Sequence, residues 1–318
     1  AVDEDQVRVR AAAEQAVAGC DLFALYADLM ALHAKLDPTM ALNPDQAAEL
    51  PVATDIVVTG EYTTPSQEQA YIENNAIAAY EENGVLIVTG SLQCPYYVLK
   101  ALKQIFNRDE SKIRVIQTVT GGGFGGKEEY PSMLAGHAAL LALKAGRPVK
   151  IVYDRHEDMA ATTKRHPAVV RHRTGLTRDG KLLAQDIEVI MDGGAYATLS
   201  AVVLSRGTLH AAGVYECPNV RVRSKVVMTH TPPNGAFRGF GAPQTLFAVE
   251  LHWERIADAL KIDSLTLRRK NIFKLGSTTA TGQHLLESVG AEECLEKTVK
   301  SSKYVSKRKE YDLWNKNS

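Results

Sequence analysis

The spacing of hydrophobic positions divides most of the chain into short strands and a smaller number of longer helices. Strands are predicted by β-branched or alternating runs at 56–58, 85–88, 113–116, 149–153 and 220–228, and by two runs within 168–193 around the turn at 178–180. Helices are predicted by helical spacing over 98–106, 133–143 and 245–260. Because the helices do not alternate regularly with the strands, the pattern favours an α+β fold over a doubly wound sheet.

The two ends of the chain differ from this middle part. Ala-rich and Leu-rich segments predict helix over residues 2–35, followed by polar steps at Asp37-Pro38 and Asn43-Pro44. From Lys297 the chain is rich in lysine and predicts a solvated helix or a fraying end. We therefore expect a helical N-terminal segment at 1–50, a folded domain at 51–295 and a polar tail at 296–318.

The composition is that of a globular protein with no need for a polyanionic partner. The 318 residues include 37 Lys and Arg against 37 Asp and Glu, whereas a nucleic-acid partner calls for a basic surplus. No apolar stretch reaches the roughly 20 residues of a membrane span, and residues 1–5 lack a basic or apolar signal segment. A cytoplasmic protein is the expectation. The four cysteines form no CxxC pair, so we expect reduced thiols rather than a locally held metal cluster.

The segment from Gly121 to Glu128 contains five glycines in eight positions. Glycine adopts backbone angles closed to other residues and allows a ligand to approach main-chain N–H groups closely. A predicted strand before the segment and a predicted helix after it favour an anion site at the helix start.

Several ligands fit such a loop. Gly121, Gly123 and Gly126 match G-x-G-x-x-G, but the acidic residue expected about 20 positions later in a dinucleotide fold has no clear match. Gly121 to Lys127 match a Walker A loop, but the next residue is Glu128 where Ser or Thr should bind Mg²⁺. A loop for a pterin pyrophosphate and a metal centre is a third interpretation, and a close-packed glycine turn is a fourth.

The whole octapeptide resembles the glycine loop of the molybdenum-cofactor subunit in the xanthine dehydrogenase/aldehyde oxidase family. Further family-like segments follow in family order, at Leu92-Gln93, Arg147–Val149, Asp154–Met159, Arg165–Pro167, Ala236–Gln244 and Leu267–Asn271. The resemblance runs from about Ala53 to Leu295. It implies a molybdenum cofactor-binding domain of this type, preceded by part of an α/β hammerhead-like domain.

The resemblance also implies which residues contact the cofactor. Gln93 resembles the glutamine that hydrogen-bonds an oxo ligand on molybdenum, and an amide suits a buried oxo group without adding charge. The backbone of Gly122, Gly123 and Phe124 would contact the pterin and the metal's oxygen ligand. Arg238 resembles the arginine beside the cofactor, where a permanently charged, forked donor fits an anionic pterin phosphate.

Three more residues concern the substrate by the same resemblance. Phe240 resembles the phenylalanine that stacks on a planar substrate. Glu128 and Arg206 occupy the two positions where family members acting on purines tend to carry Glu and Arg, and aldehyde-oxidising members tend to have apolar residues at one or both. A carboxylate and a guanidinium can bind opposite edges of a heterocycle and stabilise the charge that develops on it.

The implied reaction is hydroxylation with water as the oxygen source, with electrons leaving to iron–sulfur clusters and FAD on other domains or subunits. The family's catalytic base, a glutamate in a G-x-G-E segment, has no counterpart here. We therefore expect a fragment, a truncated product or one piece of a split subunit, which lacks a C-terminal half and holds no cofactor when isolated. The chain could form a homodimer. Two alternative functions remain open: an aldehyde oxidoreductase-type subunit, and a non-catalytic remnant or assembly module with the same fold.

The remaining polar residues invite simpler interpretations. His137, His166, His172 and His210 do not follow the spacing of metal ligands on one helix face, so we expect them to be solvated or hydrogen-bonded. The segment 156–158, His-Glu-Asp, predicts a structural turn rather than a catalytic triad.

Overall fold

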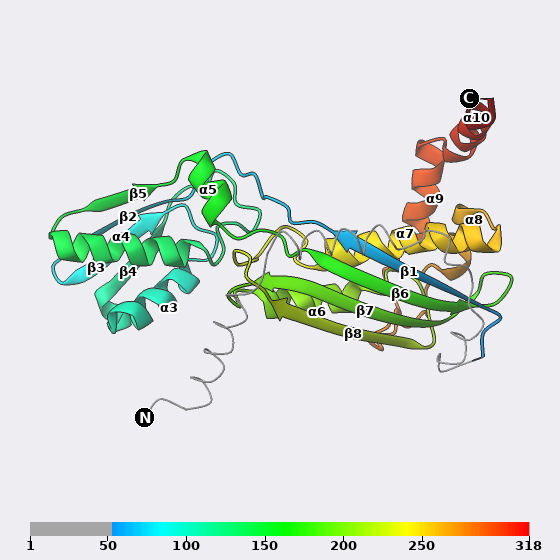
Figure 1. Cartoon of the computed structure of the whole chain (residues 1–318), viewed down its shortest axis with the longest axis horizontal. Coiled ribbons are helices and arrows are strands. Elements are labelled where there is room, and N and C mark those ends of the chain that lie inside the picture. Colours follow the sequence, from blue (N-terminus) through cyan, green and yellow to red (C-terminus); the bar gives the residue numbers. More distant parts are fainter. Residues whose placement is uncertain (1–52, 318) are drawn as a thin grey trace, which may run out of the picture. The chain divides into compact units, whose positions relative to one another are not determined.

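The computed structural model describes residues 53–317, which form two four-stranded mixed sheets with helices packed on them (Figure 1). This confirms the predicted α+β class. The predicted N-terminal helix, like the whole segment expected at 1–50, lies outside the described residues.

One sheet has the strand order β4-β3-β2-β5. Its strands are β2 (Ala76–Glu82), β3 (Val85–Gly90), β4 (Ile113–Gln117) and β5 (Val149–Val152). The β2–β3 hairpin turns at Asn83 and Gly84, which have φ of 52° and 74°, as a two-residue turn with two left-handed positions requires. β3 and β4 run parallel, because helix α3 (Pro95–Phe106) carries the chain back between them.

Helices α3 and α4 (Pro131–Ala145) cover this sheet and bury its hydrophobic side chains. The buried side of α4 is made mainly of small residues, which allow close packing: Ala135, Gly136, Ala138, Ala139 and Ala142. Pro131 fixes the start of α4, and Gly146 ends it in the left-handed conformation. The glycine segment therefore connects a strand of this sheet, β4, to a helix that is packed on it.

The other sheet has the order β1-β6-β7-β8. Its strands are β1 (Ile56–Thr64), β6 (Ala168–Leu176), β7 (Leu182–Gly194) and β8 (Val220–Met228). The first three are antiparallel neighbours, and β8 is parallel to β7 because α6 (Ser200–His210) lies between them in the chain. Helix α7 (Ala242–Leu260) packs on β1 and β6 and buries Trp253 completely.

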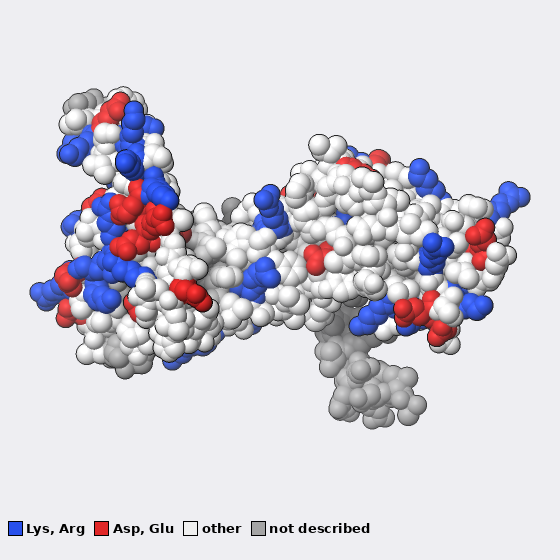
Figure 2. Space-filling view, turned by 180° about the vertical axis from the view of Figure 1, so that it is seen from behind, with Lys and Arg blue, Asp and Glu red and all other residues white. Residues whose placement is uncertain are grey.

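Charged side chains pair across neighbouring strands of this second sheet. Arg171 on β6 binds Glu61 on β1 at 2.6 Å and Glu188 on β7 at 2.8 Å. Lys225 on β8 approaches Glu188 at 3.8 Å. On the face that Figure 2 shows, Lys and Arg are likewise interspersed with Asp and Glu, so no large field of one sign forms there.

The C-terminal part of the described chain is helical, with α8 (Ser264–Asn271), α9 (Ala291–Ser301) and α10 (Tyr304–Asn317). Asp263 caps α8 by accepting a hydrogen bond from the Thr266 N–H at 2.9 Å. α9 extends across the predicted boundary at 295/296, and Arg269 on α8 binds Glu296 on α9 at 2.6 Å. Within the described part of the chain, no helix has the length and apolarity to cross a membrane.

Candidate functional site

The glycine segment is an irregular loop between Gln117, which ends β4, and Pro131, which begins α4. Turns are closed within it by Gly126 N–H to Gly123 oxygen at 2.8 Å and by Glu128 N–H to Gly125 oxygen at 3.2 Å. Gly122 and Gly125 have φ of 96° and 104°, and Phe124 has φ of 50°, which is uncommon for a residue with a side chain. Helix α4 begins at Pro131, after the glycine segment ends at Glu128. The predicted anion site is therefore wrong in placing the glycine N–H groups at the helix start.

Two glycines of this loop have no room for a side chain. A Cβ on Gly125 would stand 2.6 Å from the carbonyl carbon and oxygen of Ala236. A Cβ on Gly123 would collide with the amide of Gln93, at 2.7 Å from its Cδ. The glycines therefore permit close contact with two other segments that are distant in the sequence.

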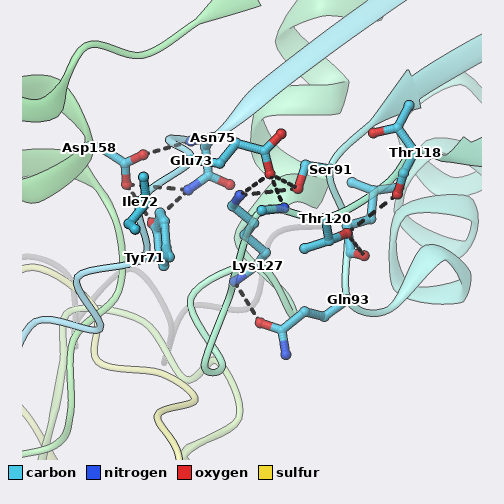
Figure 3. A network of polar contacts seen from close by, with 12 residues as sticks. Tyr71, Ile72, Glu73, Asn75, Ser91, Gln93, Thr118, Thr120, Lys127 and Asp158 are labelled. Atoms are coloured by element: carbon cyan, nitrogen blue, oxygen red, sulfur yellow. Dashed lines mark hydrogen bonds and ion pairs between the residues drawn. The ribbon is translucent and has the colours of Figure 1, made fainter.

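Gln93 lies between β3 and α3 and is fixed by the loop (Figure 3). Its N–H donates to the Lys127 oxygen at 2.8 Å, and its Oε1 accepts from the N–H groups of Gly125 at 2.9 Å and Lys127 at 3.2 Å. The amide oxygen is thus used by the protein, whereas the exposed Nε2 makes no hydrogen bond to any described residue. An amide held in this way keeps both N–H donors for a ligand.

Lys127 is completely buried, and its side chain points toward Glu73 and Ser91 inside the protein (Figure 3). Its Nζ donates to Glu73 Oε2 at 2.9 Å and to Ser91 Oγ at 3.1 Å, and lies 4.9 Å from the centre of the Tyr71 ring. Burial disfavours the ionised form of Glu73, but hydrogen bonds from Lys127, Ser91 and Gly121 lower its pKa to about 2. The Lys127–Glu73 pair is therefore an internal anchor of the loop, which excludes the Walker A interpretation.

A second loop, between β8 and α7, contacts the first through its backbone. The Arg238 N–H donates to the Phe124 oxygen at 2.8 Å. Phe240 has φ of 52° and lies between Gly239 at 91° and Gly241 at 102°. These left-handed positions explain why the segment alternates glycine with large residues.

Gly241 also brings α6 to this loop. A Cβ on Gly241 would collide with the Val203 oxygen and stand 2.9 Å from the Gly207 nitrogen, so only glycine fits against the helix. As a result the guanidinium of Arg206 lies over the ring of Phe240, 5.8 Å from its centre. The structure thus brings together two of the residues singled out from the sequence, although 34 positions separate them.

Glu128 lies on the first loop, half-buried, and burial raises the pKa of its carboxyl. Its titratable neighbours include Cys94, whose own pKa is raised by burial and by the negative charges of Glu128 and Glu129. Among the described residues no ion pair joins Glu128 to Arg206. Glu128 on the first loop and Arg206 on α6 are related through the second loop, whose Phe240 lies under the Arg206 guanidinium.

Two residues of this region were missed at the sequence level. Arg165 is buried, stacks on Phe237 at 4.0 Å and donates to the Arg238 oxygen at 3.0 Å, so it holds the second loop. It belongs to a family-like segment, but the resemblance assigned it no role. Glu129 accepts from the Ala236 N–H at 3.4 Å and was overlooked beside Glu128.

The expectation that the four histidines are solvated or hydrogen-bonded is wrong for His172. Both of its ring nitrogens are buried without a hydrogen-bond partner among the described residues, and its ring stacks on His252 with centroids 4.9 Å apart. Burial lowers the pKa of His172 to about 3. His166, by contrast, is hydrogen-bonded to Ser200 Oγ at 2.7 Å.

The arrangement of these residues fits a molybdopterin group. Gln93 directs an unused amide donor outward, and Gly123 leaves no Cβ beside it. Gly122 and Phe124 are held in the left-handed conformation on either side of the buried Gly123, and Phe124 is 45% exposed. Arg238 has its backbone fixed by Phe124 and its side chain exposed to solvent.

Comparisons with known proteins agree with this fit. Residues 36–272 match the molybdopterin cofactor-binding domain family. The chain is 41% identical over 244 residues to the nicotinate dehydrogenase large molybdopterin subunit of Eubacterium barkeri, an alignment that covers 76% of this chain and 57% of that protein. It is 39% identical to a probable xanthine dehydrogenase subunit of Bacillus subtilis, with 80% of this chain and 35% of that protein covered.

A solved structure of this group has the same fold as the chain. The aldehyde oxidoreductase from Desulfovibrio gigas superimposes with a TM-score of 0.75 and 26% identity, over 81% of this chain and 28% of that chain. The chain therefore spans only part of the length of these relatives. With its ordered motifs and its fold, it belongs to the molybdopterin cofactor-binding domain family, in the xanthine dehydrogenase/aldehyde oxidase group of molybdenum oxidoreductases.

Proposed function

We propose that this chain forms one wall of the active site of a molybdenum hydroxylase that oxidises a purine or a similar N-heterocycle with water as the oxygen source. The observation that carries the proposal is the position of the Arg206 guanidinium over the Phe240 ring, 5.8 Å from its centre. A planar aromatic substrate can stack on such a ring while the guanidinium binds an edge nitrogen or oxygen.

Glu128 supplies the complementary group. Its carboxyl is half-buried, and burial raises its pKa, so it binds a proton more readily than an exposed glutamate does. A carboxyl of this kind can accept a hydrogen bond from a ring N–H or donate one to a ring nitrogen. Glu128 and Arg206 together therefore favour a heterocycle with polar edges over a simple aldehyde.

The names of the two similar proteins point in the same direction. One is a nicotinate dehydrogenase subunit and the other a probable xanthine dehydrogenase subunit, and both nicotinate and xanthine are N-heterocycles. An aldehyde oxidoreductase-type subunit is the second candidate, supported by the structural similarity to the Desulfovibrio gigas enzyme.

The molybdenum cofactor would be held by residues of the two loops and by Gln93. Gln93 would donate its free amide N–H to an oxygen ligand of the metal, the backbone of Gly122, Gly123 and Phe124 would line the pterin, and Arg238 would neutralise phosphate charge. When bound, the cofactor supplies the two-electron oxidation of the substrate carbon. The side chains of this chain bind and orient the ring and shape the charge around it.

The remaining parts of the reaction belong to partners in this proposal. We expect iron–sulfur and FAD domains or subunits to take the electrons, and a C-terminal half of the molybdenum subunit to supply the catalytic base and the opposite wall. Exposed apolar side chains beside the glycine loop, Val119 at 93% and Phe124 at 45%, support such a covering segment.

The test is to assemble the chain with its partner chains and to compare oxidation of purines, nicotinate and aliphatic aldehydes. We expect turnover of an N-heterocycle and its loss in Arg206→Met and Phe240→Leu variants that retain molybdenum. Turnover of aldehydes alone would favour the aldehyde oxidoreductase alternative. An assembled complex that contains molybdenum but oxidises none of these compounds would support a non-catalytic assembly module.

A further inference from the structure

The Glu129 carboxyl lies at the contact between the two loops of the site. Its Oε1 accepts from the Ala236 N–H at 3.4 Å, whereas its Oε2 is buried without a hydrogen-bond partner in the described part of the chain. Gly235 and Thr163 enclose it, because a Cβ on Gly235 would collide with Glu129 Oε1 and stand 2.7 Å from Thr163 Oγ1. The Thr163 hydroxyl is itself buried and has no hydrogen-bond partner among the described residues. An ionised carboxylate is poorly solvated in such a place.

The charges around Glu129 do not stabilise its ionised form. Among the described residues, the titratable groups that interact with it include Glu128 on its own segment and Cys94 next to α3, and neither of these is a cation. Lys164, which follows Thr163, pairs instead with Glu68 at 2.9 Å, and Arg165 stacks on Phe237. Burial raises the pKa of Glu129 to about 7, and the charge of Glu128 adds to this rise, while the hydrogen bond from the Ala236 backbone opposes it.

We propose that Glu129 is a positioning residue for this site: as a neutral acid it packs against Gly235, accepts a hydrogen bond from the Ala236 N–H, and so holds the second loop against the first. The inference rests on the proposed function, because the second loop carries Arg238 and Phe240. In the neutral form Oε1 accepts from the Ala236 N–H and the buried Oε2 carries the proton, so that no uncompensated negative charge lies at the loop contact.

Loss of the proton changes the charge at this contact. The ionised Glu129 places a second negative charge next to Glu128, where its Oε2 is buried without a hydrogen-bond partner among the described residues. The loop that carries Arg238 and Phe240 is then held less firmly. Glu129 therefore acts on the reaction through other residues, and its ionisation weakens the site as the pH rises through about 7.

Infrared spectroscopy of the full chain tests the protonation state without any need for activity. We expect a protonated-carboxyl C=O band in the wild type that disappears as the pH rises through about 7. The same band should persist in Glu128→Gln and be absent in Glu129→Gln. A wild-type chain without such a band at mildly acid pH, or a band of this titration that survives Glu129→Gln, overturns the proposal.

Kinetics of the assembled enzyme test the positioning role. Glu129→Gln keeps a neutral group that both accepts and donates, so its kcat/KM should stay within about twofold of the wild type at mildly acid pH and should lose the decline through neutral pH. Glu129→Ala, which removes the hydrogen bond from the Ala236 N–H and the contact with Gly235, should lose about tenfold in kcat/KM at every pH, equivalent to about 1.4 kcal/mol. If Glu129→Gln retains the wild-type alkaline decline, or is as impaired as Glu129→Ala, the proposal is wrong. A wild-type enzyme without hydroxylase activity would refute the proposed function. The infrared band would still show whether Glu129 is protonated, because that measurement does not depend on activity.

Discussion

The backbone N–H of Arg238 donates to the carbonyl oxygen of Phe124 at 2.8 Å, and this bond joins the two glycine-rich loops of the site. Each loop carries a large residue in the left-handed conformation, Phe124 at φ 50° and Phe240 at φ 52°. The glycines beside them permit the backbone-to-backbone approach that makes the bond. The loops therefore form one structural unit, and changes at their contact should affect residues on both.

Gly125 offers the sharpest test of this contact. In Gly125→Ala the new Cβ meets the Ala236 backbone at 2.6 Å, in addition to the strain of a φ of 104°. We expect the free energy of unfolding to fall by about 3 kcal/mol or more, as for a strained and overpacked site. Chemical denaturation measures this.

Gly146→Ala is the matched control, since Gly146 also has a positive φ but has open space around its Cβ position. Its free energy of unfolding should fall only by the cost of placing alanine in the left-handed conformation, about 1 kcal/mol. Equal losses in the two variants would show that the loop contact contributes nothing.

Arg165 should contribute to the stability of the fold, although it forms no ion pair with a carboxylate among the described residues. Arg165→Met removes the donor to the Arg238 oxygen and the stacking on Phe237, and leaves that carbonyl without its 3.0 Å bond. We expect a loss of about 1–3 kcal/mol in unfolding free energy. Arg178→Met, at an exposed arginine, should be nearly neutral, and a comparable loss there would contradict the assignment.

Glu129 predicts a stability difference that depends on pH. Its pKa rises from 4.5 to about 7 on folding, so between these values the folded chain holds a proton that the unfolded chain releases. The free energy of unfolding should therefore fall by about 1.4 kcal/mol per pH unit as the pH rises through this window, and by about 3 kcal/mol in total. Denaturation of the wild type against Glu129→Gln measures this term, which should be absent from the variant.

His172 predicts the opposite slope in a more acid range. Its pKa falls from 6.5 to about 3 on folding, so below about pH 6.5 the unfolded chain takes up a proton that the folded chain refuses. Stability should drop as the pH falls through this window, by about 1.4 kcal/mol per unit. His172→Phe keeps a ring beside His252 and should remove this part of the acid sensitivity.

His137→Phe, at an exposed histidine on α4, is the control for that substitution. It should leave the acid slope unchanged. If His172→Phe unfolds with the same pH dependence as the wild type, the buried ring does not contribute to acid unfolding.

Arg206 predicts a substrate-dependent loss of activity in the assembled enzyme. Arg206→Met removes the guanidinium above Phe240, and we expect kcat/KM for an N-heterocycle to fall about 100-fold. Arg206→Lys should restore little, since a lysine lacks the planar fork. An equal loss for aldehyde and heterocycle substrates would indicate a structural role instead.

The sequence predicted those elements that depend on nearby residues. The turn at 178–180 depends on residues within a few positions, and the structure contains it between β6 and β7, with Gly180 at a φ of 83°. Strand β2 was missed, because its hydrophobic alternation is weak and its place depends on pairing with β3 and β5. The segment 156–158, predicted as a turn, is instead the first turn of helix α5 (Arg155–Ala161), which a capping box between Asp154 and Glu157 stabilises.

The sequence by itself determined the family, because many short motifs occur in family order and each keeps its residue types. It also named Gln93, Glu128, Arg206 and Phe240 as candidate site residues. Only the tertiary structure decided that Arg206 lies over Phe240, that Lys127 is an internal anchor, and that Glu129 is buried at the loop contact. These relationships depend on burial and on contacts between segments far apart in the chain, and neither property is encoded in the local pattern of residues.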